Sequence, residues 1–313
     1  MRSLTLAVVL ALLAPCATSA AHPAGAAQGV EWLGPKPAAR PVRVVSLAPS
    51  LTDTVVAMGL AGRLVGVTRY DDAPEVARLP RVGGFLDPSP EAILALRPDL
   101  VLWMADAGAL PVVRRVASLG VPVLAIPVVS VADVLACART VGGALGDPAA
   151  GDRLARSVAD AVDAARRRAG ARRRTRVLFV VGRDPLVVAG PGSYPDELLR
   201  LAGGENVVDG ARPWPVYPLD RAVAADPALV VDAAVEEPAA AIHRLDAIPA
   251  VRRGAVYRLS DDAALRPGPR LALALSELER ALDSLSPRDG RSAPSPDPLS
   301  PATRKGEPAP SPD

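Results

Sequence analysis

The sequence of 313 residues contains few side chains of the kinds that bind metals or attack substrates, with only two cysteines and two histidines. Cys16 lies near the N-terminus and Cys137 lies in an amphipathic helical pattern, whereas His22 and His243 belong to no recognisable motif. This pattern provides no internal disulfide framework. A catalytic thiol would need a histidine partner, so we expect Cys137 to be a small buried core residue. The same scarcity argues against a metal site of the usual kind.

An excess of one charge is also absent, because 36 basic and 34 acidic residues leave a net charge of only +2. This balance gives no indication of nucleic-acid binding. The sequence contains no G-x-S-x-G elbow, no Walker A loop, no G-x-G-x-x-G after a strand and no H-E-x-x-H. An α/β hydrolase or transferase is therefore a distant alternative, and we predict no catalytic residue, cofactor or metal ligand. We expect the acidic pairs at 71–72 and 261–262 to be capping or solvated loop residues.

Long hydrophobic runs are limited to the N-terminus. Arg2 precedes an apolar run that is too short to cross a bilayer, and small residues follow it, so residues 1–21 are predicted to be a secretory signal peptide. This predicts a periplasmic protein. Lipid attachment at Cys16 is an alternative, although the preceding proline is unfavourable for it. Composition predicts a flexible leader over residues 22–41 and a disordered tail, rich in proline and serine, over residues 286–313.

A long amphipathic helix is predicted over residues 147–174. Asp147 is a suitable N-cap and Pro148 a suitable first helical residue. Apolar residues then recur at helical spacing on one narrow stripe. The pattern dissolves among arginines, so we expect the helix to end near Gly170.

The sequence on one side of this helix resembles the sequence on the other. Before it, Glu91 opens a short helix that leads through Pro98 into an apolar strand. After it, Asp220 opens a short helix that leads through Pro227 into another apolar strand. Proline before a strand is common in α/β proteins and is an alternative explanation, but the aligned acids favour an internal duplication.

Alternating strands and helices predict two α/β lobes with parallel sheets, residues 42–146 and 175–285, on either side of the long helix. Ligands of such sheets bind beyond the carboxyl ends of the strands, so the two lobes can line a shared cleft. Large flat side chains at this edge suit a large, partly apolar ligand, although some of them will only pack against their own lobe. The aromatic residues expected there are Tyr70, Phe85, Trp214 and Tyr217, with Trp103 at the end of a strand.

Several motifs resemble those of one family of transport proteins. The runs RVVSLAPSLT at 43–52, VGVTRY at 65–70, VGGF at 82–85 and LRPDL at 96–100 are similar to the helical-backbone substrate-binding proteins of ABC importers. The resemblance covers about residues 42–285 and is strongest for the members that bind cobalamin. It implies two Rossmann-like lobes joined by one long helix, which is also what the duplication predicts.

The resemblance implies a non-enzymatic protein that captures a corrinoid, with cobalamin as the expected ligand, and delivers it to an ABC permease dimer with its ATPase. It also implies that Tyr70, Phe85 and Trp214 line the cleft and that Arg266 contributes a polar contact. Ferric siderophores and haem, which other members bind, remain alternatives. An anionic siderophore would favour a cluster of basic cleft residues, for which the candidates are Arg69, Arg183, Arg212 and Arg266.

The resemblance further implies that Glu91 and Asp220 dock onto arginines of the permease. Two equivalent carboxylates on two equivalent lobes would form a pseudo-symmetric pair that suits a two-fold symmetric partner. Stabilisation of each helix dipole is the alternative explanation for either acid. We expect a monomer, and the single helical connection predicts only a small closure on binding.

Overall fold

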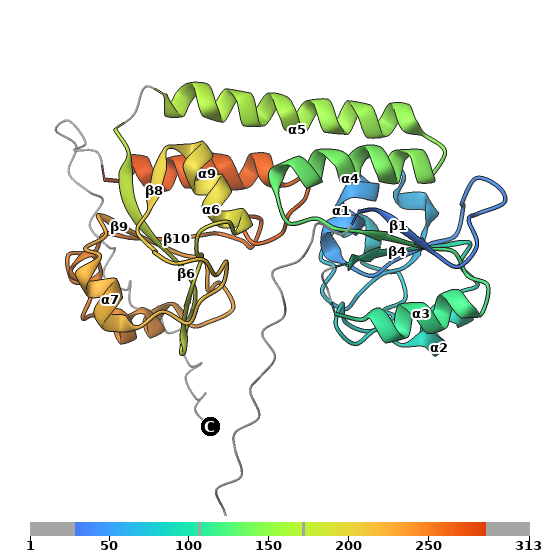
Figure 1. Cartoon of the computed structure of the whole chain (residues 1–313), viewed down its shortest axis with the longest axis horizontal. Helices are drawn as coiled ribbons and strands as arrows, with labels where there is room; N and C mark the ends of the chain where they lie inside the picture. The colour runs from blue at the N-terminus through green and yellow to red at the C-terminus, as the bar shows by residue number, and fades with distance from the viewer. Residues whose placement is uncertain (1–28, 106–107, 171–172, 286–313) are drawn as a thin grey trace, which may run out of the picture.

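Two α/β lobes lie side by side beneath one long helix in the computed structural model, which describes residues 29–105, 108–170 and 173–285 (Figure 1). The predicted signal peptide with Cys16 and the predicted C-terminal tail lie outside the described residues. The fold agrees with the predicted class of two Rossmann-like lobes connected by a helix.

The first lobe contains a five-stranded sheet in the order β1-β5-β4-β2-β3. Its strands are β1 (Glu31–Leu33), β2 (Val44–Ser46), β3 (Leu64–Gly66), β4 (Leu100–Met104) and β5 (Val123–Ile126). Its helices are α1 (Pro49–Ala57), α2 (Pro90–Ala95), α3 (Leu110–Ser118) and α4 (Val131–Ala144), with 3-10 turns η1 (Ala61–Arg63) and η2 (Pro74–Val76).

The second lobe also contains five strands, in the order β10-β9-β6-β7, with β8 pairing to β6. Its strands are β6 (Thr175–Arg183), β7 (Leu186–Val188), β8 (Gly204–Asn206), β9 (Leu229–Asp232) and β10 (Val256–Arg258). Its helices are α6 (Tyr194–Ala202), α7 (Leu219–Ala224), α8 (Pro249–Arg252) and α9 (Leu271–Asp283), with the 3-10 helix η4 (Ala239–Leu245).

Both sheets are mostly parallel, as expected for strands that alternate with helices. Each also has one antiparallel pairing that the alternating pattern did not predict, β1 with β5 and β7 with β6. The β6–β7 hairpin turns at Asp184-Pro185.

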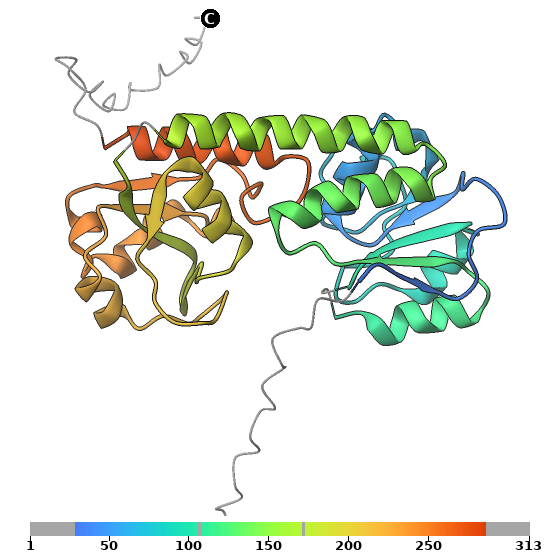
Figure 2. The ribbon, with the colours of Figure 1, turned by 45° about the horizontal axis from the view of Figure 1, so that its top comes forward.

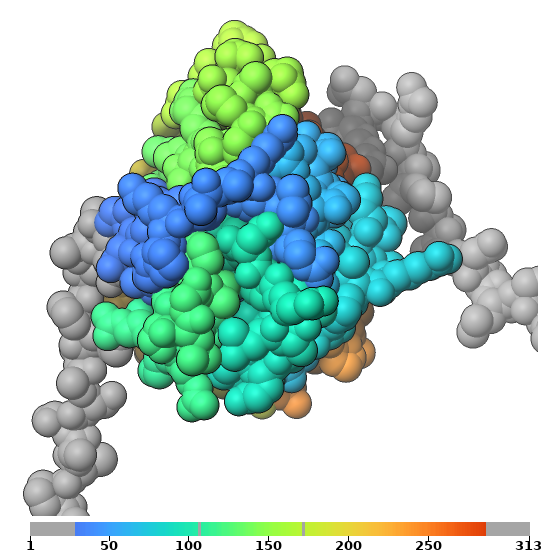
Figure 3. Space-filling view, turned by 90° about the vertical axis from the view of Figure 1, so that its right-hand side faces the viewer, coloured from blue at the N-terminus to red at the C-terminus, as the bar shows by residue number. Residues whose placement is uncertain are grey.

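Part of the segment expected to be a flexible leader, residues 22–41, pairs with the first lobe. Trp32 in β1 pairs with Leu124 of β5, and the Arg40 Nε donates a hydrogen bond of 3.0 Å to the Leu145 carbonyl. Figure 3 shows this blue segment lying across the outer surface of the first lobe. A three-residue edge strand in a segment rich in proline and glycine carries too little apolar periodicity to be found from sequence.

The connecting helix α5 (Pro148–Ala169) has 22 residues and a length of about 33 Å. Asp147 caps it by accepting a hydrogen bond of 3.0 Å from the Ala150 amide, and Gly170 follows its last turn. The lower face of α5 packs on α4 from the first lobe and on α6 and α9 from the second (Figure 2).

One hydrophobic cluster therefore runs continuously beneath α5 from lobe to lobe. It joins Leu102 and Ile126 of the first sheet, Val158 and Val162 of α5, and Phe179 of the second sheet, all at most 4% exposed. The opposite face of each sheet has its own separate cluster. The lobes are thus held together by a shared core as well as by one helix.

Candidate ligand cleft and docking surfaces

The loop after β3 presents Tyr70 to solvent. Asp71 is buried, and its Oδ2 accepts hydrogen bonds from the Thr68 amide (2.7 Å) and the Thr68 hydroxyl (2.6 Å). This turn fixes the loop while Tyr70 remains 49% exposed. The Arg69 guanidinium lies 5.5 Å from the Tyr70 ring centroid and is ion-paired with Asp87. Of the two roles expected for Asp71, capping or a solvated loop position, burial excludes the second, and its hydrogen bonds stabilise this turn.

Phe85 lies beside Tyr70 on a neighbouring loop. The two ring centroids are 5.9 Å apart with an interplanar angle of 68°, an edge-to-face arrangement. The Arg69 amide donates to the Gly83 carbonyl at 2.8 Å, and a Cβ on Gly83, whose φ is +108°, would lie 2.6 Å from the Asp87 carbonyl oxygen. Close packing of these loops therefore requires glycine and orients the aromatic pair.

Trp214 lies on the loop after β8 and is 47% exposed. The carbonyls on either side of it are anchored, since Pro213 O accepts from the Gly190 amide at 2.9 Å and Pro215 O from the Val188 amide at 3.2 Å. A Cβ on Gly190 would collide with the carbonyl of Arg212. The indole therefore projects from a fixed backbone.

Two other aromatics expected at the strand edges are packing residues. Tyr217 is 5% exposed, donates its hydroxyl to Asp209 at 3.1 Å and lies under the Arg221 guanidinium. Trp103 is 3% exposed at the end of β4.

Burial raises the pKa of the Cys137 thiol to about 12, which makes that cysteine an unreactive core residue, as expected.

Arg266 lies between the lobes rather than free in a cleft. Its Nη1 is 3.1 Å from Oδ1 of Asp72 in the first lobe, and its Nε is ion-paired with Asp262. Arg270 stands beside it, 2.6 Å from Asp261 and 3.9 Å from Asp72. Ion pairs with Asp72 thus connect segment 261–270 of the second lobe to the first lobe. Sequence reasoning missed this cluster, because Asp72 and Arg266 are 194 residues apart.

Asp53 on α1 is the half-buried carboxylate that faces this charged cluster. Burial raises the pKa of Asp53 from 3.8 to about 6, and the charges of Asp71 and Asp72 act in the same direction. The guanidinium groups of Arg270 and Arg266 oppose the rise but do not cancel it.

The four basic residues considered for an anionic siderophore do not form a cluster of free charges. Arg183 is fully buried against Asp232, with 3.3 Å between Nε and Oδ1. Arg69 and Arg266 are held in the ion pairs described above. Arg212 is exposed and has no ion-pair partner among the described residues.

The two acids expected to dock are both exposed and occupy matching places. Glu91 is the second residue of α2 and Asp220 the second residue of α7. Ser89 caps α2, since its hydroxyl oxygen accepts from the Ala92 amide at 3.1 Å, whereas Pro218 provides no such cap for α7. Figure 1 shows α2 and α7 at the ends of their lobes remote from α5.

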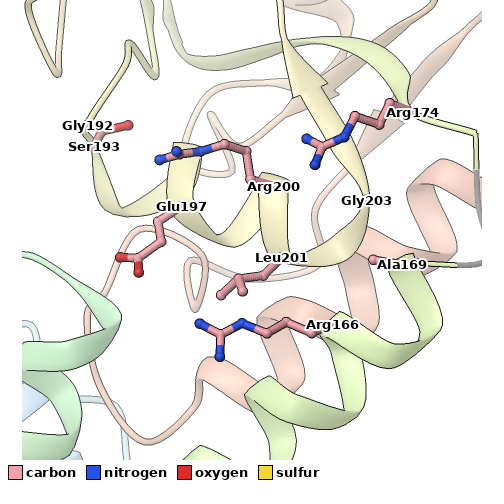
Figure 4. Close-up of a pocket in the computed structure, with 10 residues that line it drawn as sticks. Arg166, Ala169, Arg174, Gly192, Ser193, Glu197, Arg200, Leu201 and Gly203 are labelled. Atoms are coloured by element: carbon pink, nitrogen blue, oxygen red, sulfur yellow. The ribbon is translucent and has the colours of Figure 1, made fainter.

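A cavity of about 670 Å³ lies between α5 and α6 (Figure 4). Arg166 and Arg200 line it but are paired with Asp163 (3.3 Å) and Asp196 (2.9 Å). Glu197 at its rim accepts a hydrogen bond of 2.9 Å from the Val131 amide at the start of α4. The cavity therefore lies between the C-terminal end of α5 and the second lobe, and Tyr70, Phe85 and Trp214 do not line it.

A sequence model of the periplasmic binding protein family matches residues 44–263, well over half of the chain. The chain belongs to this family. As a periplasmic binding protein it is the substrate-binding component of an ABC importer and not an enzyme, with an ABC transporter and a small ligand as partners. Among the described residues, no helix is long and apolar enough to span a bilayer.

Relatives of this binding protein carry different ligands. The vitamin B12-binding protein of Vibrio parahaemolyticus is 26% identical over 247 residues, 78% of this chain and 90% of that protein. The solved structure of the periplasmic vitamin B12-binding protein of Vibrio cholerae matches with a TM-score of 0.70 at 22% identity, covering 80% of this chain and 99% of that one. A periplasmic haem-binding protein from Roseiflexus sp. RS-1 matches with a TM-score of 0.71 at 31% identity, covering 78% and 98%. The shared fold therefore does not fix the ligand.

Proposed function

We propose that this binding protein captures a corrinoid, cobalamin, between its two lobes in the periplasm and delivers it to an ABC permease. The observation that carries the proposal is the exposure of aromatic rings from both lobes at loops that follow parallel strands. Tyr70 and Phe85 form a pair on the first lobe, and Trp214 stands on the second. Fixed aromatic faces suit a large flat ligand, because they bury much area at little entropic cost.

Haem is the second candidate, favoured by the 31% identity to a haem-binding protein. The two ligands make different demands, since a corrinoid brings axial ligands to its cobalt whereas haem iron takes one from the protein. A tyrosine phenolate can fill that role. Tyr70 is 49% exposed, so its hydroxyl is accessible to a ligand.

Visible spectroscopy separates the two candidates. The protein is incubated with cyanocobalamin or with hemin, passed through gel filtration and examined for retained colour. Retention of cobalamin by both the wild type and Tyr70→Phe supports the corrinoid proposal. Retention of hemin alone, with a charge-transfer band that Tyr70→Phe abolishes, supports haem. Retention of neither ligand would contradict both.

We propose further that Glu91 and Asp220 meet the two halves of the permease dimer. Arginine forks are the natural complement, because they bind carboxylates bidentately. The double variant Glu91→Lys with Asp220→Lys should abolish uptake and leave ligand affinity unchanged. Charges at the edge of an interface mainly control the rate at which two proteins associate and the orientation in which they bind. Asp160→Lys with Asp163→Lys makes the same kind of charge reversal on α5 and is the control. Full uptake by the first variant with its own permease would disprove the docking assignment.

A further inference from the structure

The two acid-bearing helices end in the same unusual backbone conformation. Within residues 29–105, 108–170 and 173–285, only Arg97 (φ 44°) and Asp226 (φ 38°) have positive φ without being glycine. Each stands six residues after the acid of its lobe, and each precedes a proline. The left-handed conformation is strained for a non-glycine residue, so the surrounding structure must stabilise it.

An arginine side chain donates a hydrogen bond to each of these helix ends. The Arg43 Nη2 donates a hydrogen bond of 2.7 Å to the carbonyl of Leu96, the C-cap residue of α2. The Arg176 Nη2 donates one of 2.6 Å to the carbonyl of Ala225, the C-cap residue of α7. Arg43 directly precedes β2 and Arg176 is the second residue of β6, so the two arginines hold similar places although the helix sequences differ.

The main chain of the same arginines holds the segment that follows. The Arg43 carbonyl accepts from the Asp99 amide at 2.9 Å, and the Arg176 carbonyl accepts from the Ala228 amide at 2.9 Å. Each arginine therefore forms hydrogen bonds on both sides of the left-handed residue. Its guanidinium donates to the carbonyl of the preceding residue, and its own carbonyl accepts from an amide that follows. In the second lobe Arg253 also donates to the Pro227 carbonyl, but that contact lies beyond the helix end.

We infer that Arg43 and Arg176 are positioning residues that hold α2 and α7 at matched orientations, so that Glu91 and Asp220 present one pseudo-symmetric surface to a two-fold symmetric, arginine-bearing partner. This inference rests on the docking proposed above. Helices of six residues are marginal on their own and take their orientation from such contacts. Arg43 and Arg176 fix the directions of the two carboxylates, whereas Glu91 and Asp220 themselves contact the partner.

The test is the double variant Arg43→Gln with Arg176→Gln, which removes both guanidinium groups, with Arg156→Gln on the exposed face of α5 as the matched control. Amide hydrogen exchange should accelerate in residues 90–97 and 219–226 only. Retention of cyanocobalamin or hemin should stay at the wild-type level. The protein concentration for half-maximal uptake in vesicles containing its own permease should rise about tenfold, the scale of a lost charged rim contact.

The two proposals fail in distinguishable ways. Normal uptake by the Glu91→Lys, Asp220→Lys variant overturns docking, and with it the positioning role. Failure of that variant together with normal uptake by the arginine variant overturns the positioning role alone, as does unchanged exchange in both helices. If the glutamine variant does not fold, Arg43→Lys with Arg176→Lys, which keeps the charges but loses the fork, is measured in the same way.

Discussion

Replacement of Asp53 by asparagine is predicted to stabilise the protein at neutral pH. The carboxylate of Asp53 is half-buried, and its pKa is raised from 3.8 to about 6 by burial. A group whose pKa is higher in the folded state than in the unfolded state favours folding while it is protonated. Its contribution is therefore complete below pH 3.8 and is lost as the pH rises through about 6.

The size of the effect follows from this difference in pKa. At 1.36 kcal/mol per pKa unit, the difference between 3.8 and about 6 corresponds to roughly 3 kcal/mol. Because the side chain retains some solvent contact, screening reduces this to about 1–2 kcal/mol. The substituted amide would carry no charge at any pH, so we expect the Asp53→Asn variant to gain this amount at pH 7.5 and almost nothing at pH 4.

Urea denaturation at pH 4, 5, 6 and 7.5 measures the predicted difference between Asp53→Asn and the wild type. Asp160→Asn removes an exposed carboxylate from α5 and should show no comparable rise with pH. A constant difference across the four pH values would refute the reasoning. Destabilisation at pH 7.5 would also refute it, because it would show that attraction to Arg266 and Arg270 exceeds the cost of burial.

Three further predictions concern the core, the cleft and the lobes. Asp232→Asn leaves the buried charge of Arg183 without its main partner, so the free energy of unfolding should fall by about 3–5 kcal/mol; chemical denaturation with an unchanged slope checks this. Trp214→Ala should weaken ligand binding by about 1–3 kcal/mol in calorimetry, and unchanged affinity in a folded variant would remove Trp214 from the site. Ligand binding should change the radius of gyration only slightly, because the lobes share a core; a large decrease in X-ray scattering would contradict this.

The architecture was largely predictable because local signals and the global fold agree. Asp147, Pro148 and Gly170 mark the ends of α5 through capping preferences that act within one turn. The acids and prolines of the repeat occur at equal spacing, so the similarity of the lobes was visible in the sequence alone. Such signals need no knowledge of distant contacts.

The details of the candidate site depend on distant contacts and were less predictable. The pairing of Arg266 with Asp72 connects residues from different lobes, and no local pattern announces it. Trp103 lies near the C-terminal end of β4 and Tyr217 lies on the same loop as Trp214, but both are buried, whereas Tyr70 and Trp214 are exposed. Loop packing decides which aromatic side chains face solvent. At Gly190, for example, a Cβ would collide with the Arg212 carbonyl, so glycine is needed for the loop that carries Trp214 to pack there.

The core shared beneath α5 determines how this two-lobed protein unfolds. Neither lobe can be separated from the other without exposing apolar surface of α5 and of the helices packed on it. The two lobes are therefore not independent folding units, although each has its own sheet. Calorimetry should show one cooperative transition for the whole chain, and either half expressed alone should be prone to aggregate.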